Sequence, residues 1–185
     1  QNAFHAYPQE TLAAKGGFLS IWRHEFKTSY MPLFNHRDKL GHKIRLAYAY
    51  GAAMWNVGLG VDVGTEDYAL GNYGVAEQWL GGDVTASFKR LLGPFDLNVG
   101  LAWRLSEQIL TRLDENLLGN VDYSTESSVT GLSLGPMVSL GWRLFLSPRW
   151  FMGLECSANG WFRQEGKNVT LHTEVGAGLS LGVDI

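Results

Sequence analysis

The sequence predicts an all-β fold, an eight-stranded antiparallel up-and-down transmembrane β-barrel. Three observations predict it: strict alternation of apolar and polar residues, connections that alternate between long and short, and a complete absence of charge from the apolar faces. Residues 170–185 show the alternation best, because every second residue from Leu171 to Ile185 is uncharged and most of these residues are apolar. That length exceeds the average globular strand of about 5 to 6 residues and suits a strand that crosses a membrane.

The same alternation recurs along the chain. It predicts strands near residues 16–30, 42–50, 55–63, 80–89, 97–106, 132–144, 150–159 and 170–185. Pro136 interrupts the sixth of these, and a proline inside a paired strand predicts a bulge or a local break. A lateral gap in the barrel wall is one consequence that such a break allows.

The connections between these strands fall into two classes. Polar and mostly long loops are expected near residues 31–41, 64–77, 109–128 and 164–168. Short turns are expected near residues 51–54, 91–95 and 146–149. An even number of strands with short turns at one end and longer loops at the other is typical of transmembrane β-barrels.

The charged residues occupy one face of each predicted strand. An Arg or Lys on a lipid-facing position would cost about 2 to 4 kcal/mol at the middle of a membrane. A soluble barrel would reverse the pattern, with an apolar interior and a polar exterior. The sequence therefore predicts an apolar outer wall, with Trp55, Trp142 and Trp150 in an interfacial belt, and a narrow lumen filled by polar side chains.

The charges predicted to face the lumen form the candidate site. They are Arg23, Glu25, Arg45, Asp62, Asp83, Arg104, Arg143, Glu155 and Glu174. Because an isolated buried charge is expensive, we expect opposite charges to pair and to plug the barrel. A proton or ion pathway along the same residues is the alternative.

Composition excludes several classes of function. The net charge of −3 gives no basic face for nucleic acid, and the single cysteine, Cys156, cannot form a disulfide within the chain. Neither Glu66-Asp67 nor the segment Asp114-Glu115-Asn116 has the spacing of a calcium loop, so we expect no metal and no cofactor. The chain starts at Gln1 without an apolar leader, which predicts a mature form whose export signal has been removed.

Two groups of residues are candidates for catalysis. His172 and Glu174 share the lumen face of the last strand, and hairpin register predicts that they lie near Ser157 and Asn159. A second group, around the first loop, comprises His36, Asp38 and His42. Ordinary polar residues of the interior and the loops are the simpler interpretation of both.

Residues 16–185 resemble, by this pattern, the small eight-stranded outer-membrane β-barrels of Gram-negative bacteria, of the OmpA transmembrane domain and OmpX sort. The resemblance implies a bacterial outer-membrane location with periplasmic termini, and outer-membrane lipids including lipopolysaccharide as partners. The chain departs from the family at Ile185, where such barrels commonly end on an aromatic residue. The family includes structural barrels, adhesins, solute conduits and enzymes that modify lipid A, so fold alone does not select a function.

The expected organisation is an N-terminal periplasmic segment, residues 1–15, followed by the barrel, residues 16–185. We expect a non-enzymatic structural or interaction protein, and an accessory subunit of a larger outer-membrane complex is one form that this role takes. The alternatives are a lipid A-modifying acyltransferase or deacylase and a narrow conduit for small solutes.

Overall fold

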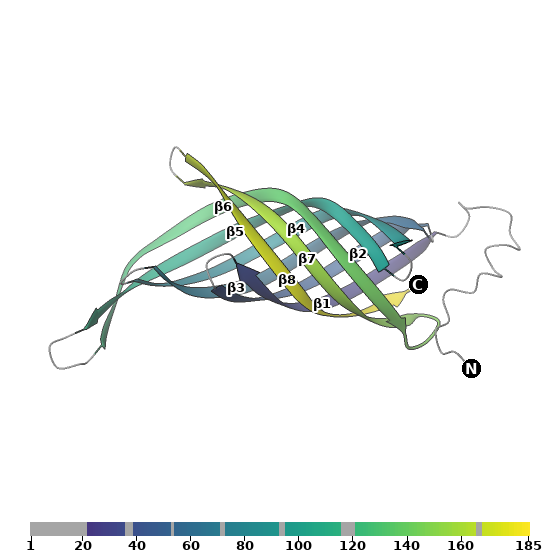
Figure 1. Cartoon of the computed structure of the whole chain (residues 1–185), viewed down its shortest axis with the longest axis horizontal. Helices are drawn as coiled ribbons and strands as arrows, with labels where there is room; N and C mark the ends of the chain where they lie inside the picture. Colours follow the sequence, from purple (N-terminus) through teal and green to yellow (C-terminus); the bar gives the residue numbers. More distant parts are fainter. Residues whose placement is uncertain are drawn as a thin grey trace, which may run out of the picture.

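The protein is a closed antiparallel β-barrel of eight strands (Figure 1). The computed structural model describes residues 22–35, 39–52, 54–70, 73–92, 95–115, 121–165 and 168–185. The strands are β1 (Arg23–Asn35), β2 (Lys39–Gly51), β3 (Trp55–Leu70), β4 (Tyr73–Leu92), β5 (Phe95–Glu115), β6 (Val121–Phe145), β7 (Trp150–Glu165) and β8 (Asn168–Asp184). Each strand pairs with the next, and β8 pairs with β1, which confirms the predicted fold class. The part of the chain that is described contains no helix long and apolar enough to cross a membrane.

The alternation in the sequence sets which face each side chain occupies. On β3, Leu59 and Val61 point outward and are 58% and 54% exposed, whereas their neighbour Asp62 points inward and is 9% exposed. Successive residues of a strand point to opposite faces, so the uncharged set forms the outer wall and the polar set fills the lumen.

The predicted long loops were wrong in extent. β1 and β2 run through most of 31–41, β3 and β4 through most of 64–77, and β5 and β6 through most of 109–128. The polar side chains there suggested loops, but ladder hydrogen bonds join backbone groups, so pairing continues where the side chains become polar. Residues 1–21, including the predicted N-terminal segment and the start of the predicted first strand, lie outside the described residues.

Pro136 interrupts the β6–β7 ladder without shifting its register. Leu134 pairs with Phe162 and Met137 with Asn159, and the two intervening positions of β6 have no bridge to β7. A β-carbon on Gly135 would overlap the carbonyl oxygen of Gly160, so the two backbones stay in contact. The predicted local break is therefore present, but the wall is closed there and the lateral gap is absent from the described strands.

The two ends of the barrel differ. β1 starts and β8 ends where the short connections lie, with Glu25 opposite Asp184. At the other end the β5–β6 hairpin extends farthest, because β6 is 25 residues long. Figure 1 shows this hairpin and the β7–β8 hairpin diverging at the end opposite the start of β1 and the end of β8.

Candidate functional site

Ion pairs close the short-turn end of the lumen. The Glu25 carboxylate accepts hydrogen bonds from Lys89 Nζ at 2.5 Å and from Arg143 Nη1 at 2.8 Å. Arg143 Nε lies 2.5 Å from Asp96 Oδ2. The Arg143 guanidinium also lies 4.5 Å from the centre of the Phe151 ring, which is 1% exposed. The ring and its charged neighbours therefore form the floor of the barrel.

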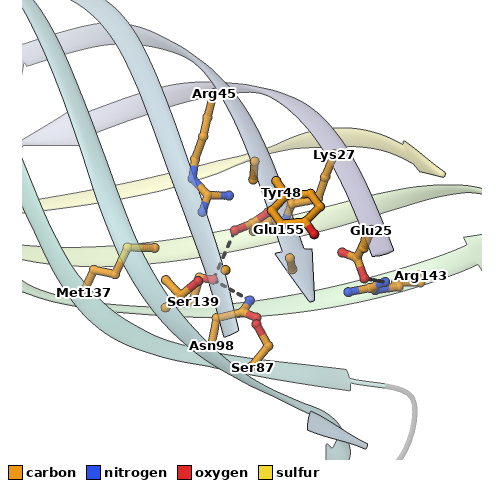
Figure 2. A pocket seen from close by; sticks show the side chains of 14 residues that line it. Glu25, Lys27, Arg45, Tyr48, Ser87, Asn98, Met137, Ser139, Arg143 and Glu155 are labelled. Carbon is orange, nitrogen blue, oxygen red and sulfur yellow. Dashed lines mark hydrogen bonds and ion pairs between the residues drawn. The ribbon is translucent and has the colours of Figure 1, made fainter. Parts of the chain in front are cut away.

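A polar hollow lies above this floor (Figure 2). The space in it that the centre of a water molecule can occupy is only about 20 Å³, which is room for one or two waters. Lys27 Nζ donates to Glu155 at 2.7 Å, and Ser139 Oγ donates to the same carboxylate at 3.1 Å. Asn98 Nδ2 in turn donates to Ser139 Oγ at 2.8 Å. The groups lining the hollow are already bonded to one another.

Arg45 on β2 and Asp83 on β4 form a two-pronged ion pair across β3. Arg45 Nε lies 2.7 Å from Asp83 Oδ2, and Arg45 Nη2 lies 2.6 Å from Asp83 Oδ1. The pair passes over Gly60, where a β-carbon would overlap both partners. A bidentate arginine–carboxylate pair fixes both side chains more strictly than a single bond does.

Arg104 occupies the middle of the lumen between two tryptophans. Its guanidinium carbon lies 4.0 Å from the centre of the Trp79 ring and 4.4 Å from that of Trp161. It also pairs with Glu174, which accepts a hydrogen bond from Asn159 Nδ2 at 3.0 Å. The cation and the two rings fill the cross-section with bulky side chains, and cation–π contacts are strongest when they are desolvated in this way.

Another charged layer lies toward the long-hairpin end. Arg163 Nη1 lies 3.2 Å from Glu77 Oε1, and Gln108 Nε2 donates to Glu77 Oε2 at 2.8 Å. Glu66 is the register partner of Glu77 across β3 and β4. Ion-paired layers therefore occur along the lumen from one end to the other.

The sequence-predicted lumen residues occupy several of these layers. The structure buries Glu25, Arg45, Asp62, Asp83, Arg104, Glu155 and Glu174, while Arg143 and Arg23 remain partly exposed. Asp62 accepts a hydrogen bond from Trp79 Nε1 at 3.1 Å rather than joining the Arg45 pair. Arg23 lies at the start of β1, at the rim of the barrel.

Sequence reasoning missed further lumen residues. They are Lys43, Glu66, Glu77, Asp96, Arg163, Trp79 and Trp161. Most lie beyond the ends assigned to the strands, as Glu77 does in a predicted loop. The signal was available, because Glu77 lies six positions before Asp83 and Arg163 eight positions after Glu155, so continued alternation points both inward.

The candidate catalytic residues of the last strand and its neighbour make other contacts than the hypothesis requires. Ser157 Oγ donates to Met31 Sδ at 3.0 Å. The Nε2 atom of His172 lies 3.1 Å from the Thr170 hydroxyl, and Glu174 is held by Arg104. Hairpin register places Glu174 opposite Asn159, one of its two expected neighbours, but places His172 opposite Trp161. These residues do not form the relay of serine, histidine and carboxylate that acyl transfer requires.

The second catalytic group is only partly described. His36 and Asp38 lie outside the described residues. His42 faces outward, where its Nδ1 atom lies 2.7 Å from the Tyr30 hydroxyl. Among the residues that the structure describes, no three histidine, cysteine, aspartate or glutamate side chains are grouped to hold a metal ion.

Aromatic side chains gather on the outer face at the short-turn end. The Trp22 ring stacks on Tyr50 at 5.0 Å between centres and meets Trp55 edge-on at 5.6 Å. Nearby, His24 Nδ1 lies 2.7 Å from the Tyr48 hydroxyl. Aromatic rings with polar tips are typical of the boundary between lipid and water.

Comparison with known proteins identifies the fold. No protein-family model and no curated protein matches the chain. Among solved structures, the chain is similar to Ail, the attachment invasion locus protein of Yersinia pestis, in complex with the heparin analogue sucrose octasulfate. The identity is 12%, the match covers 89% of this chain and 99% of that chain, and the TM-score is 0.56.

Two further solved structures are also similar to this chain. A major outer membrane protein from Thermus thermophilus is 13% identical over 88% of this chain and 99% of that chain, with a TM-score of 0.54. The outer membrane protein OprG from Pseudomonas aeruginosa is 11% identical over 91% of this chain and 98% of that chain, with a TM-score of 0.50. Identities this low establish architecture and leave function open. The chain therefore has the fold of the small eight-stranded outer-membrane β-barrels.

Proposed function

We propose that this protein is an outer-membrane barrel that acts by holding other molecules and not by catalysis or conduction. The outer wall supports the membrane location, because the described residues expose a continuous set of Leu, Val, Phe and Trp side chains there. Soluble proteins rarely expose apolar patches larger than a few hundred Å². Lipid is the solvent that such a surface fits.

The observation that carries the proposal is the filled lumen. Arg104 is clasped between Trp79 and Trp161, and Arg143 and Phe151 occupy the floor. The intervening hollow is lined by groups that bond one another, such as Lys27 and Glu155. A solute would have to break buried ion pairs to pass, and removing one partner of a buried pair costs about 3 to 5 kcal/mol.

The ends of the barrel are then the surfaces left for function. We place the short-turn end and both termini in the periplasm, and the β5–β6 hairpin outside the cell. Residues 1–15 would bind a larger outer-membrane assembly as a periplasmic segment, which makes the protein an accessory subunit. Lipopolysaccharide and other outer-membrane lipids would surround the wall.

A pull-down in mild detergent tests this role. The native protein is purified from outer membranes, and proteins and lipids that accompany it are identified by mass spectrometry. We expect a stoichiometric protein partner that is lost when residues 1–15 are deleted. A matched control replaces the same stretch with a Gly/Ser segment of equal length, which preserves spacing and removes side chains.

The enzyme and conduit alternatives predict other results. A lipid A-modifying enzyme would be recovered alone and would change the mass of lipid A in its membranes, and replacing His172 or His36 would abolish the change. A conduit would give steady conductance in planar bilayers. Either result would contradict the proposed role.

A further inference from the structure

Two prolines interrupt the ladders on either side of the β7–β8 hairpin. On one side, the bridges between β6 and β7 are missing at Gly135 and Pro136. On the other side, the bridges between β8 and β1 are missing at Met31 and Pro32, although Pro32 keeps its pairing with His42 of β2. Each interruption separates the hairpin from the strand beside it.

Both prolines face the hairpin. His24 and Ile185 exchange two backbone hydrogen bonds, of 3.0 and 2.8 Å, so the backbone groups of His24 face β8. Backbone groups alternate in direction along a strand, so those of Pro32 face β8 too. Leu146 donates a hydrogen bond to the start of β7, and the same alternation turns Pro136 toward β7. A proline has no N–H, so each ladder loses a hydrogen bond to the hairpin.

Beyond the two interruptions the hairpin is joined to its neighbours at few positions. Among the described residues there, β6 pairs with β7 at positions 133–134 and β1 pairs with β8 at positions 33–35. The ladder between β7 and β8 themselves has no missing position from 150 to 165. Figure 1 shows the hairpin diverging from the β5–β6 hairpin at this end. We call residues 160–165 and 168–177 the outer hairpin, a continuous unit with weak borders.

The outer hairpin carries side chains that plug the lumen. Trp161 and Glu174 hold Arg104 of β5, on the opposite side of the barrel. The Nη1 atom of Arg163 lies 3.2 Å from the Oε1 atom of Glu77 on β4. Trp161, Glu174 and Arg163 are all buried. Contacts across the lumen therefore hold the outer hairpin closed where its ladders are weak.

The short-turn half of the same hairpin is firmly joined to both neighbours. Its β7 strand carries Phe151 and Glu155, which belong to the floor and to the hollow above it. There β6 pairs with β7 at every position from 137 to 145, and β1 pairs with β8 at every position from 25 to 30. The floor of the barrel therefore stays in place if the outer hairpin moves.

We propose that the outer hairpin is a lid on the lumen, with its hinges at Pro32 and Pro136. Its contacts with Arg104 and Glu77 are the latch, and the lid is closed in this structure. Opening withdraws Trp161 from Arg104 and turns the outer half of the barrel into a cup that ends at the floor. The inference goes beyond the interaction role proposed above and does not depend on it.

Amide hydrogen exchange of the full chain in phospholipid nanodiscs, followed by NMR, tests the lid. The amides of Phe162 and Val175 face β6 and β1, and we call them the seam amides. Those of Trp161 and Glu174 face the partner strand within the hairpin. Lid movement breaks the bonds of the seam amides and keeps the others. We expect the seam amides to exchange about tenfold or more faster than the amides of Trp161 and Glu174.

A latch variant and a matched control separate lid opening from general loss of stability. Arg163→Gln breaks the pair with Glu77, and we expect exchange at the seam amides to rise about tenfold or more. Lys27→Gln breaks another ion pair to β7, the 2.7 Å contact with Glu155, on the floor side of the interruptions. We expect this control to leave the exchange of the seam amides nearly unchanged.

A hinge variant gives a second measurement that does not disturb the latch. Pro136→Ala supplies an N–H toward β7, and we expect exchange at Phe162 to slow about tenfold. Pro148→Ala is the control, because Pro148 lies in the turn between β6 and β7, outside the ladder. We expect that substitution to leave the exchange at Phe162 unchanged.

Three outcomes would overturn the inference. Equal exchange at the seam amides and at Trp161 and Glu174 would show that the hairpin either unravels as a whole or stays shut with the wall. Equal effects of Arg163→Gln and Lys27→Gln would show that the latch is not specific to the outer hairpin. Equal effects of the two proline substitutions would remove the hinge. None of these results depends on whether the pull-down finds a partner.

Discussion

Arg45 and Asp83 are joined by two hydrogen bonds, of 2.7 and 2.6 Å, directly above the bare backbone of Gly60. Both side chains are buried, with 9% and 3% of their surfaces exposed. Gly60, on the strand between them, has no side chain to separate them. Two strands that are not neighbours, β2 and β4, are therefore joined over β3. This pair therefore ties β2 to β4 independently of the backbone ladder.

Replacing one member of this pair should be worse than replacing both. Asp83→Leu leaves the Arg45 guanidinium buried without its bidentate partner, which costs about 3 to 5 kcal/mol. Arg45→Met combined with Asp83→Leu removes both charges, and we expect a loss of less than about 1.5 kcal/mol. Urea unfolding in lipid vesicles measures both. A double variant as unstable as the single one would show that the pair itself stabilises the barrel.

Gly178 tests the closure between β8 and β1. A β-carbon there would overlap the carbonyl oxygen of Tyr30, a backbone atom that cannot rotate away. We expect Gly178→Ala to lower the free energy of unfolding by about 1 to 3 kcal/mol. Gly141→Ala is the control, because its nearest neighbour, the Leu154 carbonyl oxygen, would be 3.9 Å away. Equal losses of unfolding free energy in the two variants would contradict a close contact between the β8 and β1 backbones at Gly178.

Charge on the outer wall tests the membrane location. Leu59→Arg places a cation in the middle of the apolar band of β3, which should cost about 2 to 4 kcal/mol in a bilayer. Thr65→Arg lies on the same face of the same strand near the edge of the band, where the cost should fall to about 0 to 1 kcal/mol. The two variants are compared by unfolding in lipid vesicles. If the wall faced water instead, neither substitution would change the free energy of unfolding.

Trp161 tests whether the lumen is plugged. Trp161→Ala removes one of the two rings that hold Arg104 and opens the middle layer. We expect no steady conductance from the natural protein in planar bilayers and measurable conductance from this variant. Phe162→Ala is the control, because Phe162 follows Trp161 and points outward, 49% exposed. Conductance by the natural barrel would instead favour the conduit alternative.

The sequence was most informative where lipid and lumen impose opposite demands. Leu59 and Asp62 could be assigned to faces because a membrane barrel tolerates charge on one side only. The information ends where both faces are polar: Glu66 and Glu77 were assigned to a loop although they are register partners in β3 and β4. Ladder bonds do not depend on side-chain polarity, so the pattern does not locate the strand ends outside the apolar band. It gives only the face of each residue once the strand is extended to it.

The sequence also could not predict which side chains pair within the lumen. Alternation predicts that Arg104 and Glu174 point inward, but strand tilt and the cross-section of the barrel decide that they meet. The same holds for Trp79 and Trp161. A tryptophan is apolar and is expected on the outer wall, but the position of these two residues in their strands places both rings in the lumen, against Arg104. Faces are local properties of a strand, whereas contacts across a barrel are properties of the closed ring.

The ladder between β1 and β8 has a kinetic consequence. It joins the first and the last of the described strands, for example Glu25 with Asp184, and so encloses a longer loop of chain than any other pairing in the barrel. Closing a long loop costs more entropy than forming a hairpin, and contacts distant in sequence slow folding. Hairpins should therefore form early and this seam late, leaving the edges of β1 and β8 exposed in the final intermediate. In a cell, that interval is when the growing barrel is most vulnerable to proteases and to pairing with the wrong strand.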